Sequence, residues 1–111
     1  MTVSIGNIGI DTGDVPGATA FWQAVTGYEV TSSDEDGSFL NDPDKQHPGL
    51  YVQRVPEPKV GKNRVHIDLF TDDLEGELTR IQGLGATEVQ RHDGWVVLAD
   101  TDGNQFCVVA A

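Results

Sequence analysis

The sequence has one cysteine, few basic residues and no long apolar run. The single cysteine, Cys107, excludes an internal disulfide and a zinc site built from several cysteines, so nothing indicates an oxidising compartment. Seven Lys and Arg residues stand against 18 Asp and Glu residues, and this net charge of −11 argues against nucleic acid or an anionic membrane as a partner. No apolar run reaches membrane-spanning length, and the N-terminus lacks the pattern of a signal peptide. We therefore expect a cytoplasmic protein.

Two segments of the chain have helical spacing of apolar residues. The first is expected to begin at the N-cap Asp14 and to stop at Gly27. The second is expected to begin at Asp72, with Glu75 completing a capping box, and to stop at Gly85. The apolar residues that these helices would bury are Ala18, Phe21, Trp22 and Val25 in the first and Leu74, Leu78 and Ile81 in the second.

Short segments of β type flank both helices, with one before each helix and three after it. The predicted strands are Val3–Asp11, Tyr28–Ser32, Ser38–Asn41, Gly49–Val55, Asn63–Thr71, Ala86–Arg91, Trp95–Ala99 and Gln105–Val109. Prolines at 56 and 58 predict an extended linker between the halves. This order predicts one domain over residues 1–111, with a first module at 1–55, a linker at 56–62 and a second module at 63–111.

The two halves also match position by position, in the same order along the chain. The equivalent pairs are Asn7 and His66, Asp14 and Asp73, Asp36 and Asp93, Asp42 and Asp100, and Gln53 and Cys107. Matches through every element favour an internal duplication. We expect an α+β fold of two βαβββ modules, with the helices on the convex side of a curved mixed sheet. A ferredoxin-like dimeric barrel is the alternative, and three strands after each helix disfavour it.

Three stretches of the second half carry a family resemblance. Residues 63–69 (Asn-Arg-Val-His-Ile-Asp-Leu), 84–87 (Leu-Gly-Ala-Thr) and 99–107 resemble the glyoxalase-like branch of the vicinal oxygen chelate superfamily. That superfamily includes glyoxalase I, extradiol dioxygenases, fosfomycin resistance enzymes and bleomycin resistance proteins. The resemblance covers essentially the whole chain. It implies paired βαβββ modules, a small-molecule pocket and a homodimer, which would also cover exposed sheet edges.

In metal-using relatives, four ligands, commonly His and Glu, come from the first and last strand of each module. The repeat assigns these positions to Asn7, Gln53, His66 and Cys107. His66 alone is a ligand typical of the family, and a set that supplies at most one negative charge suits magnesium, manganese or iron poorly. We therefore expect no metal and no other cofactor; a bound ion would be held by these four residues.

Three functions remain open from the sequence. The first is a glyoxalase-like enzyme with lyase or isomerase chemistry, in which His66 acts as general base or electrostatic stabiliser, assisted by Asp68 and Gln53. The second is a non-catalytic protein that sequesters a drug or metabolite, as bleomycin resistance proteins do, and the acidic surface would suit a cationic ligand. The third is a structural domain with a vestigial pocket. The residues expected to contact a ligand are Asn7, Tyr51, Gln53, Trp95 and Cys107, the last as an unreactive thiol.

Overall fold

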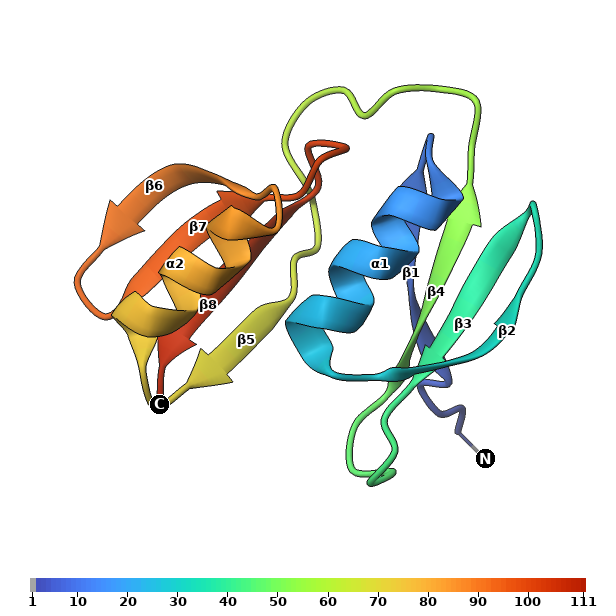
Figure 1. Ribbon diagram of the computed structural model, residues 1–111, viewed down its shortest axis with the longest axis horizontal. Coiled ribbons are helices and arrows are strands. Elements are labelled where there is room, and N and C mark those ends of the chain that lie inside the picture. Colours follow the sequence, from blue (N-terminus) through green and yellow to red (C-terminus); the bar gives the residue numbers. More distant parts are fainter. Residues whose placement is uncertain (1) are drawn as a thin grey trace. The chain divides into compact units, whose positions relative to one another are not determined.

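The computed structural model describes residues 2–111, and the chain divides into two compact units, Met1–Pro58 and Lys59–Ala111. Each unit is a four-stranded mixed sheet with one helix on it (Figure 1). Within the described residues, no helix has the length and apolar character needed to cross a membrane.

Unit 1 contains one helix and four strands. They are β1 (Asn7–Thr12), α1 (Val15–Thr26), β2 (Glu29–Ser33), β3 (Gly37–Asn41) and β4 (Gly49–Arg54). The strand order in the sheet is β1-β4-β3-β2, in which β1 and β4 run parallel and the other neighbours antiparallel. Helix α1 packs on β3 and β4 and buries Phe21 and Trp22, whose rings meet edge to face at 5.2 Å.

Unit 2 has the same connectivity. Its elements are β5 (Asp68–Thr71), α2 (Leu74–Gly83), β6 (Thr87–His92), β7 (Trp95–Ala99) and β8 (Gln105–Ala110). The strand order β5-β8-β7-β6 repeats that of unit 1, again with the first pair parallel and the others antiparallel. The two predicted βαβββ modules are therefore confirmed.

The two faces of the unit 2 sheet differ in character, because side chains alternate along each strand. One face packs against α2 and forms the core, whose members are at most 2% exposed: Leu78, Ile81, Val96, Leu98, Phe106 and Val108. Asp68 and Cys107 alternate with these residues and point to the opposite face. That second face has no helix of unit 2 on it (Figure 1).

The strand predicted from Asn63 begins only at Asp68. The chain bends at Arg64 and Val65, and Val65 is 83% exposed. The side-chain amide of Asn63 donates to the Gln105 carbonyl at 3.1 Å, so this stretch is tied to β8 by a side chain instead of a regular ladder.

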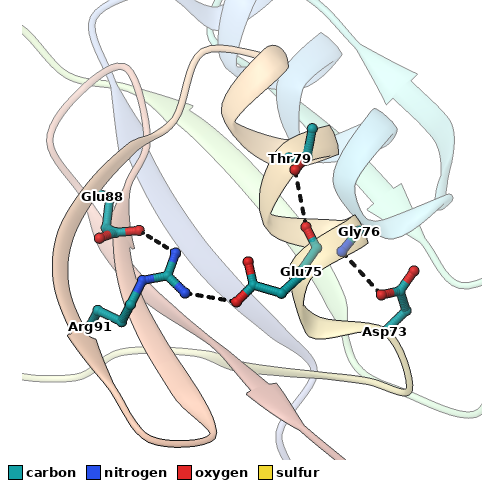
Figure 2. Close-up of polar contacts among 6 residues, drawn as sticks. All are labelled: Asp73, Glu75, Gly76, Thr79, Glu88 and Arg91. Carbon is teal, nitrogen blue, oxygen red and sulfur yellow. Dashed lines mark hydrogen bonds and ion pairs between the residues drawn. The ribbon is translucent and has the colours of Figure 1, made fainter.

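The N-cap of α2 is Asp73, and the predicted capping box of Asp72 and Glu75 is wrong. Asp73 Oδ1 accepts from the Gly76 N–H at 3.1 Å (Figure 2), as Asp14 Oδ1 accepts from the N–H of Gly17 in α1. Both caps therefore have the same Asp-x-x-Gly form, which agrees with the repeat.

Glu75 instead binds Arg91 and ties the helix to the edge strand β6. The Arg91 guanidinium lies 2.8 Å from carboxylate oxygens of both Glu75 and Glu88 (Figure 2). The hydrogen bond from Arg91 to Glu88 is the largest cause of a raised pKa of the Arg91 guanidinium, and the hydrogen bond to Glu75 raises this pKa further. Arg91 therefore connects α2 to the edge strand β6 through exposed side chains.

Alanine at two glycines of α2 should have different effects on stability. A Cβ on Gly76 would lie 2.1 Å from Asp73 Oδ2, so Gly76→Ala must displace the cap. Loss of the cap costs about 1 kcal/mol and offsets the similar gain in helix propensity. Gly83, the last residue of α2, has no atom within 4 Å of an added Cβ. Gly83→Ala should therefore raise the free energy of unfolding by about 0.5–1 kcal/mol.

Urea denaturation followed by circular dichroism measures both substitutions. We expect a higher midpoint for Gly83→Ala and no gain for Gly76→Ala. Equal stabilisation by the two substitutions would contradict the assignment of Asp73 as the cap.

Candidate functional site

Unit 2 brings His66, Asp68 and Cys107 together. One nitrogen, oxygen or sulfur atom of each lies within 4.8 Å of the others. His66 Nε2 is 3.1 Å from Asp68 Oδ1, a hydrogen-bonding distance. These three residues are called the polar cluster below.

The pairing of β5 with β8 positions this cluster. Asp68 is the register partner of Cys107, and directly opposed residues of neighbouring strands point to the same face. His66 lies two residues before the start of β5, and the carbonyl of the intervening Ile67 accepts from the Cys107 N–H at 2.9 Å. This hydrogen bond and the Asn63 contact described above together hold the backbone at His66 against β8.

The members of the polar cluster differ in exposure. The side chains of His66 and Asp68 are about half exposed, at 52% and 50%, whereas Cys107 is 3% exposed. Burial raises the pKa of the Cys107 thiol, and the nearby charge of Asp68 and a hydrogen bond to it raise the pKa further, against a smaller opposing effect of Lys62. The thiol is therefore protonated near neutral pH and is a poor nucleophile.

A row of apolar and aromatic side chains lies beside the polar cluster. Successive register partners across β5, β8, β7 and β6 form this aromatic row: Phe70, Val109, Trp95 and His92. Phe70 is 74% exposed and Trp95 39% exposed. The rings of Trp95 and His92 stack at 3.8 Å with an interplanar angle of 10°.

The aromatic row shares its face with the polar cluster. Phe70 follows Asp68, and Val109 follows Cys107, by two residues along their strands, which returns the side chain to the same face. This face, here called the open face, therefore offers a polar end and an apolar surface next to it.

The structure does not bring together the two predicted site residues at the ends of the β1–β4 ladder. Asn7 pairs with Gly49, and Gln53 pairs with Asp11 four residues further along. At about 3.3 Å per residue, roughly 13 Å separate the two backbone positions. Asn7 and Gln53 therefore do not share one small ligand sphere within unit 1.

Tyr51, another predicted contact, lies half-buried in unit 1 beside Phe39, with ring centroids 4.5 Å apart. A Cβ at Gly37 would lie 2.5 Å from its hydroxyl oxygen, so the phenol ring lies across Gly37. Glycine is needed at position 37 for this ring to lie against the sheet.

The register also corrects the equivalence of Gln53 and Cys107. Cys107 pairs with Asp68, which lies five residues before the helix cap Asp73. In unit 1, the residue five positions before the cap Asp14 is Gly9, and Gly9 pairs with Tyr51. The counterpart of Cys107 in unit 1 is therefore Tyr51. Matching Gln53 with Cys107 also matches Gly49 with Gly103, since each glycine lies four residues before its partner in the sequence. Gly49, however, opens β4, whereas Gly103 lies in the turn before β8 with a φ of 88°.

Two residues of the open face were not identified from the sequence, although signals for both were present. Phe70 stands two residues after Asp68, so strand alternation assigns it to the same face. His92 is separated from Trp95 by the two-residue turn Asp93-Gly94, a pattern that makes the flanking residues cross-strand partners.

Comparison with known proteins identifies a family and a fold. A family model described as a glyoxalase-like domain matches residues 7–109. No curated protein sequence matches this chain.

Several solved structures are similar to this chain at low sequence identity. A glyoxalase/bleomycin resistance protein/dioxygenase family enzyme from Burkholderia phytofirmans PsJN has a TM-score of 0.79 at 16% identity, over 97% of this chain and 98% of that one. The fosfomycin resistance protein FosX from Listeria monocytogenes has a TM-score of 0.80 at 18% identity, over 100% and 93%. A mutant of that FosX, complexed with Mn(II) and 1S,2S-dihydroxypropylphosphonic acid, has a TM-score of 0.76 at 19% identity, over 98% and 90%.

These structural likenesses establish the fold, and they agree with the repeated βαβββ connectivity of both units. The family model covers nearly the whole chain. The chain therefore belongs to the glyoxalase-like domain family.

Proposed function

We propose that this protein binds a small organic molecule on the open face of unit 2. The observation that carries the proposal is that the polar cluster and the exposed aromatic row lie on one sheet face, two residues apart along β5 and β8. Small-molecule sites commonly combine apolar walls with a few convergent polar groups. The phosphonic acid bound in a FosX structure of the same fold supports a small-molecule ligand.

The two parts of the face suit different parts of a ligand. Phe70 and Trp95 together offer exposed aromatic surface that a flat or apolar group can cover, and such surface costs free energy in water. His66 and Asp68 provide hydrogen-bonding atoms at the polar end. A ligand fits this arrangement if its apolar group and its oxygen-bearing group are as far apart as two side chains on the same face of a strand, at positions i and i+2.

His66 is the proposed general base of a lyase or isomerase reaction. Its Nε2 faces the Asp68 carboxylate, so a neutral imidazole carries its proton there and leaves Nδ1 as the acceptor. The carboxylate fixes this tautomer and stabilises the imidazolium that forms when Nδ1 takes a proton. Cys107, buried and protonated, is assigned no nucleophilic role.

The donor set of the polar cluster fits a divalent cation, which the fold family implies at this position. The count of negative charges that argued against a metal omitted Asp68, and the cluster contains an imidazole, a carboxylate and a thiol. The charge count was the main argument against a bound metal, and it no longer holds. With an ion present, His66, Asp68 and Cys107 would hold it, and the ion would polarise a ligand oxygen in place of general-base catalysis by His66. Asn7, Tyr51 and Gln53 lie in unit 1, where they remain predicted site residues, and they are not part of this donor set.

Sequestration without catalysis is a second candidate. The net charge of −11 favours a cationic ligand through long-range attraction, as expected for a protein that binds a basic drug. In that case the open face would bind the ligand, and His66 would act only as a hydrogen-bonding group.

The two tryptophans provide a test of ligand binding. Trp95 lies on the open face, whereas Trp22 is 2% exposed in the core of unit 1 and serves as an internal control. We predict that a binding compound shifts the indole N–H resonance of Trp95 and leaves that of Trp22 in place. Suitable probes are thiol conjugates, catechols, short acids and cationic glycopeptides, each tested with and without a chelator. Phe70→Ser should weaken the binding of a compound that shifts Trp95.

Two outcomes of that screen would contradict the proposal. One is a compound that binds stoichiometrically and shifts resonances of unit 1 alone. The other is the absence of any Trp95 shift across all four chemical classes.

Substitution of His66 separates catalysis from sequestration. If His66 is a general base, a bound ligand with an acidic C–H bond should exchange that hydrogen for deuterium in D2O. His66→Gln should slow the exchange by about 10²–10⁴-fold, while the dissociation constant changes little. Unchanged exchange in His66→Gln would reject the general-base role and leave sequestration.

We also propose a homodimer, because each four-stranded sheet has open edges. The edge strands β2 and β6 each carry a register shift, at Val30/Ser32 and Glu88/Gln90, a feature that discourages pairing. The opposite edges, β1 and β5, have no such shift and are better candidates. Light scattering at micromolar concentration should give a mass of twice the 12.0 kDa chain; a monomeric mass would refute the dimer.

A further inference from the structure

We propose that His92 holds the indole of Trp95 upright on the open face, so that a planar aromatic ring with a cationic substituent can insert between Trp95 and Phe70. Val109 separates these two aromatic residues in the aromatic row. The space above Val109 and between the two rings is called the ring slot below. The ring slot lies on the open face and therefore rests on the proposed function, to which it adds a class of ligand and a positioning role for His92.

Stacking on His92 sets the orientation of the indole. His92 and Trp95 are register partners on β6 and β7, and the Cβ atoms of such partners lie about 4.5–5.5 Å apart. The two ring centroids are 3.8 Å apart, and the ring planes are inclined by 10°. Because both side chains rise from the same sheet surface, rings this close meet face to face across the strands; rings lying flat side by side would be further apart. The indole therefore stands up from the sheet with one face against His92.

The second face of the indole is directed away from β6, over β8 and towards β5. Trp95 is the register partner of Val109, and Val109 is the partner of Phe70. His92 covers one face of Trp95, yet the residue remains 39% exposed. Since valine is shorter than either aromatic residue, Val109 forms a low floor between two taller walls.

The strand spacing leaves room for one planar ring in the ring slot. Phe70 and Trp95 lie two strands apart, which separates their backbones by about 9.5 Å. Three parallel rings in contact need about 7–8 Å between the outer planes, because carbon atoms in contact lie about 3.5–4.0 Å apart. Phe70 is 74% exposed, so its ring is free to rotate onto an inserted ring. A saturated ring is puckered and thicker, and it lacks the stacking interaction.

One end of the ring slot leads to a carboxylate. Two residues back along β8 and β5, the positions of Val109 and Phe70 are replaced by Cys107 and Asp68. The Asp68 side chain is half exposed. A ring with an ammonium group on the edge that faces Cys107 would place that charge beside Asp68, and the net charge of −11 attracts such a cation.

The methyl chemical shifts of Val109 in the ligand-free protein test the orientation of the indole. Protons above the face of an aromatic ring are shifted upfield, whereas protons beyond its edge are shifted downfield. We expect upfield Val109 methyl signals in the unmodified protein. These signals should move to ordinary values in Trp95→Leu and in His92→Ser, and they should stay upfield in His92→Phe, where a ring remains at position 92.

Gln90→Ser is the matched control, because Gln90 lies two residues before His92 on the same face of β6 and pairs with Val97. It should leave the Val109 methyl signals in place. Downfield Val109 methyl signals in the unmodified protein, or unchanged signals in His92→Ser, would overturn the positioning role of His92.

Three probes test the class of ligand: naphthylmethylammonium, its fully saturated counterpart, and naphthoate. We expect titrations followed at the Trp95 indole N–H to show that the planar ammonium compound binds at least about tenfold more tightly than the saturated one, because it makes aromatic contacts on both faces. Naphthoate should bind more weakly than the planar ammonium compound, since its carboxylate would face Asp68. His92→Ser should reduce the preference for the planar ring, and His92→Phe should restore it.

Equal affinity for the planar and saturated ammonium compounds would overturn the ring slot and leave the proposed function, since both compounds would still bind the open face. Absence of binding by naphthylmethylammonium, or tighter binding of naphthoate, would also overturn the proposal. Failure of the proposed function is seen separately, as the absence of any Trp95 shift in the compound screen described above. The Val109 methyl shifts do not depend on that screen.

Discussion

The parallel pairing of β5 with β8 is the interaction on which the candidate site depends. Its register makes Asp68 the partner of Cys107 and Phe70 the partner of Val109. A shift of one residue would turn each of the β5 side chains to the other face. The core residues Phe106 and Val108 are buried on the α2 side, and this fixes the opposite face as the one to which Cys107 points. The core of unit 2 thus determines which side chains the open face presents.

Most of the fold could be predicted from the sequence, because its signals are local. Helix spacing, turn residues and the repeat gave both modules in the correct order. The errors lie where several local signals compete: Asp72 and Asp73 both offer a carboxylate before α2, and the backbone selects the second. The start of β5 was also misplaced, because Asn63 satisfies the Gln105 carbonyl through its side chain and the chain bends before the ladder begins.

The candidate site was only partly predictable, since it depends on pairing between distant segments. Strand alternation places His66 and Asp68 on one face because they are two residues apart, but only the register brings Asp68 next to Cys107. The equivalence of Gln53 and Cys107 failed because the turns before β4 and β8 differ in length, which a comparison anchored on glycines cannot detect. Phe70 could have been found by counting two residues from Asp68.

The most direct test of this account is a set of proton–proton NOE measurements on the unmodified protein. The account requires the His66 ring and the Cys107 side chain to be neighbours on the face away from α2. It predicts cross-peaks between the His66 ring protons and Cys107 Hβ, with no contact from Cys107 Hβ to the methyl groups of Leu78 or Ile81. Contacts of Cys107 Hβ with those methyl groups, and none with His66, would contradict it.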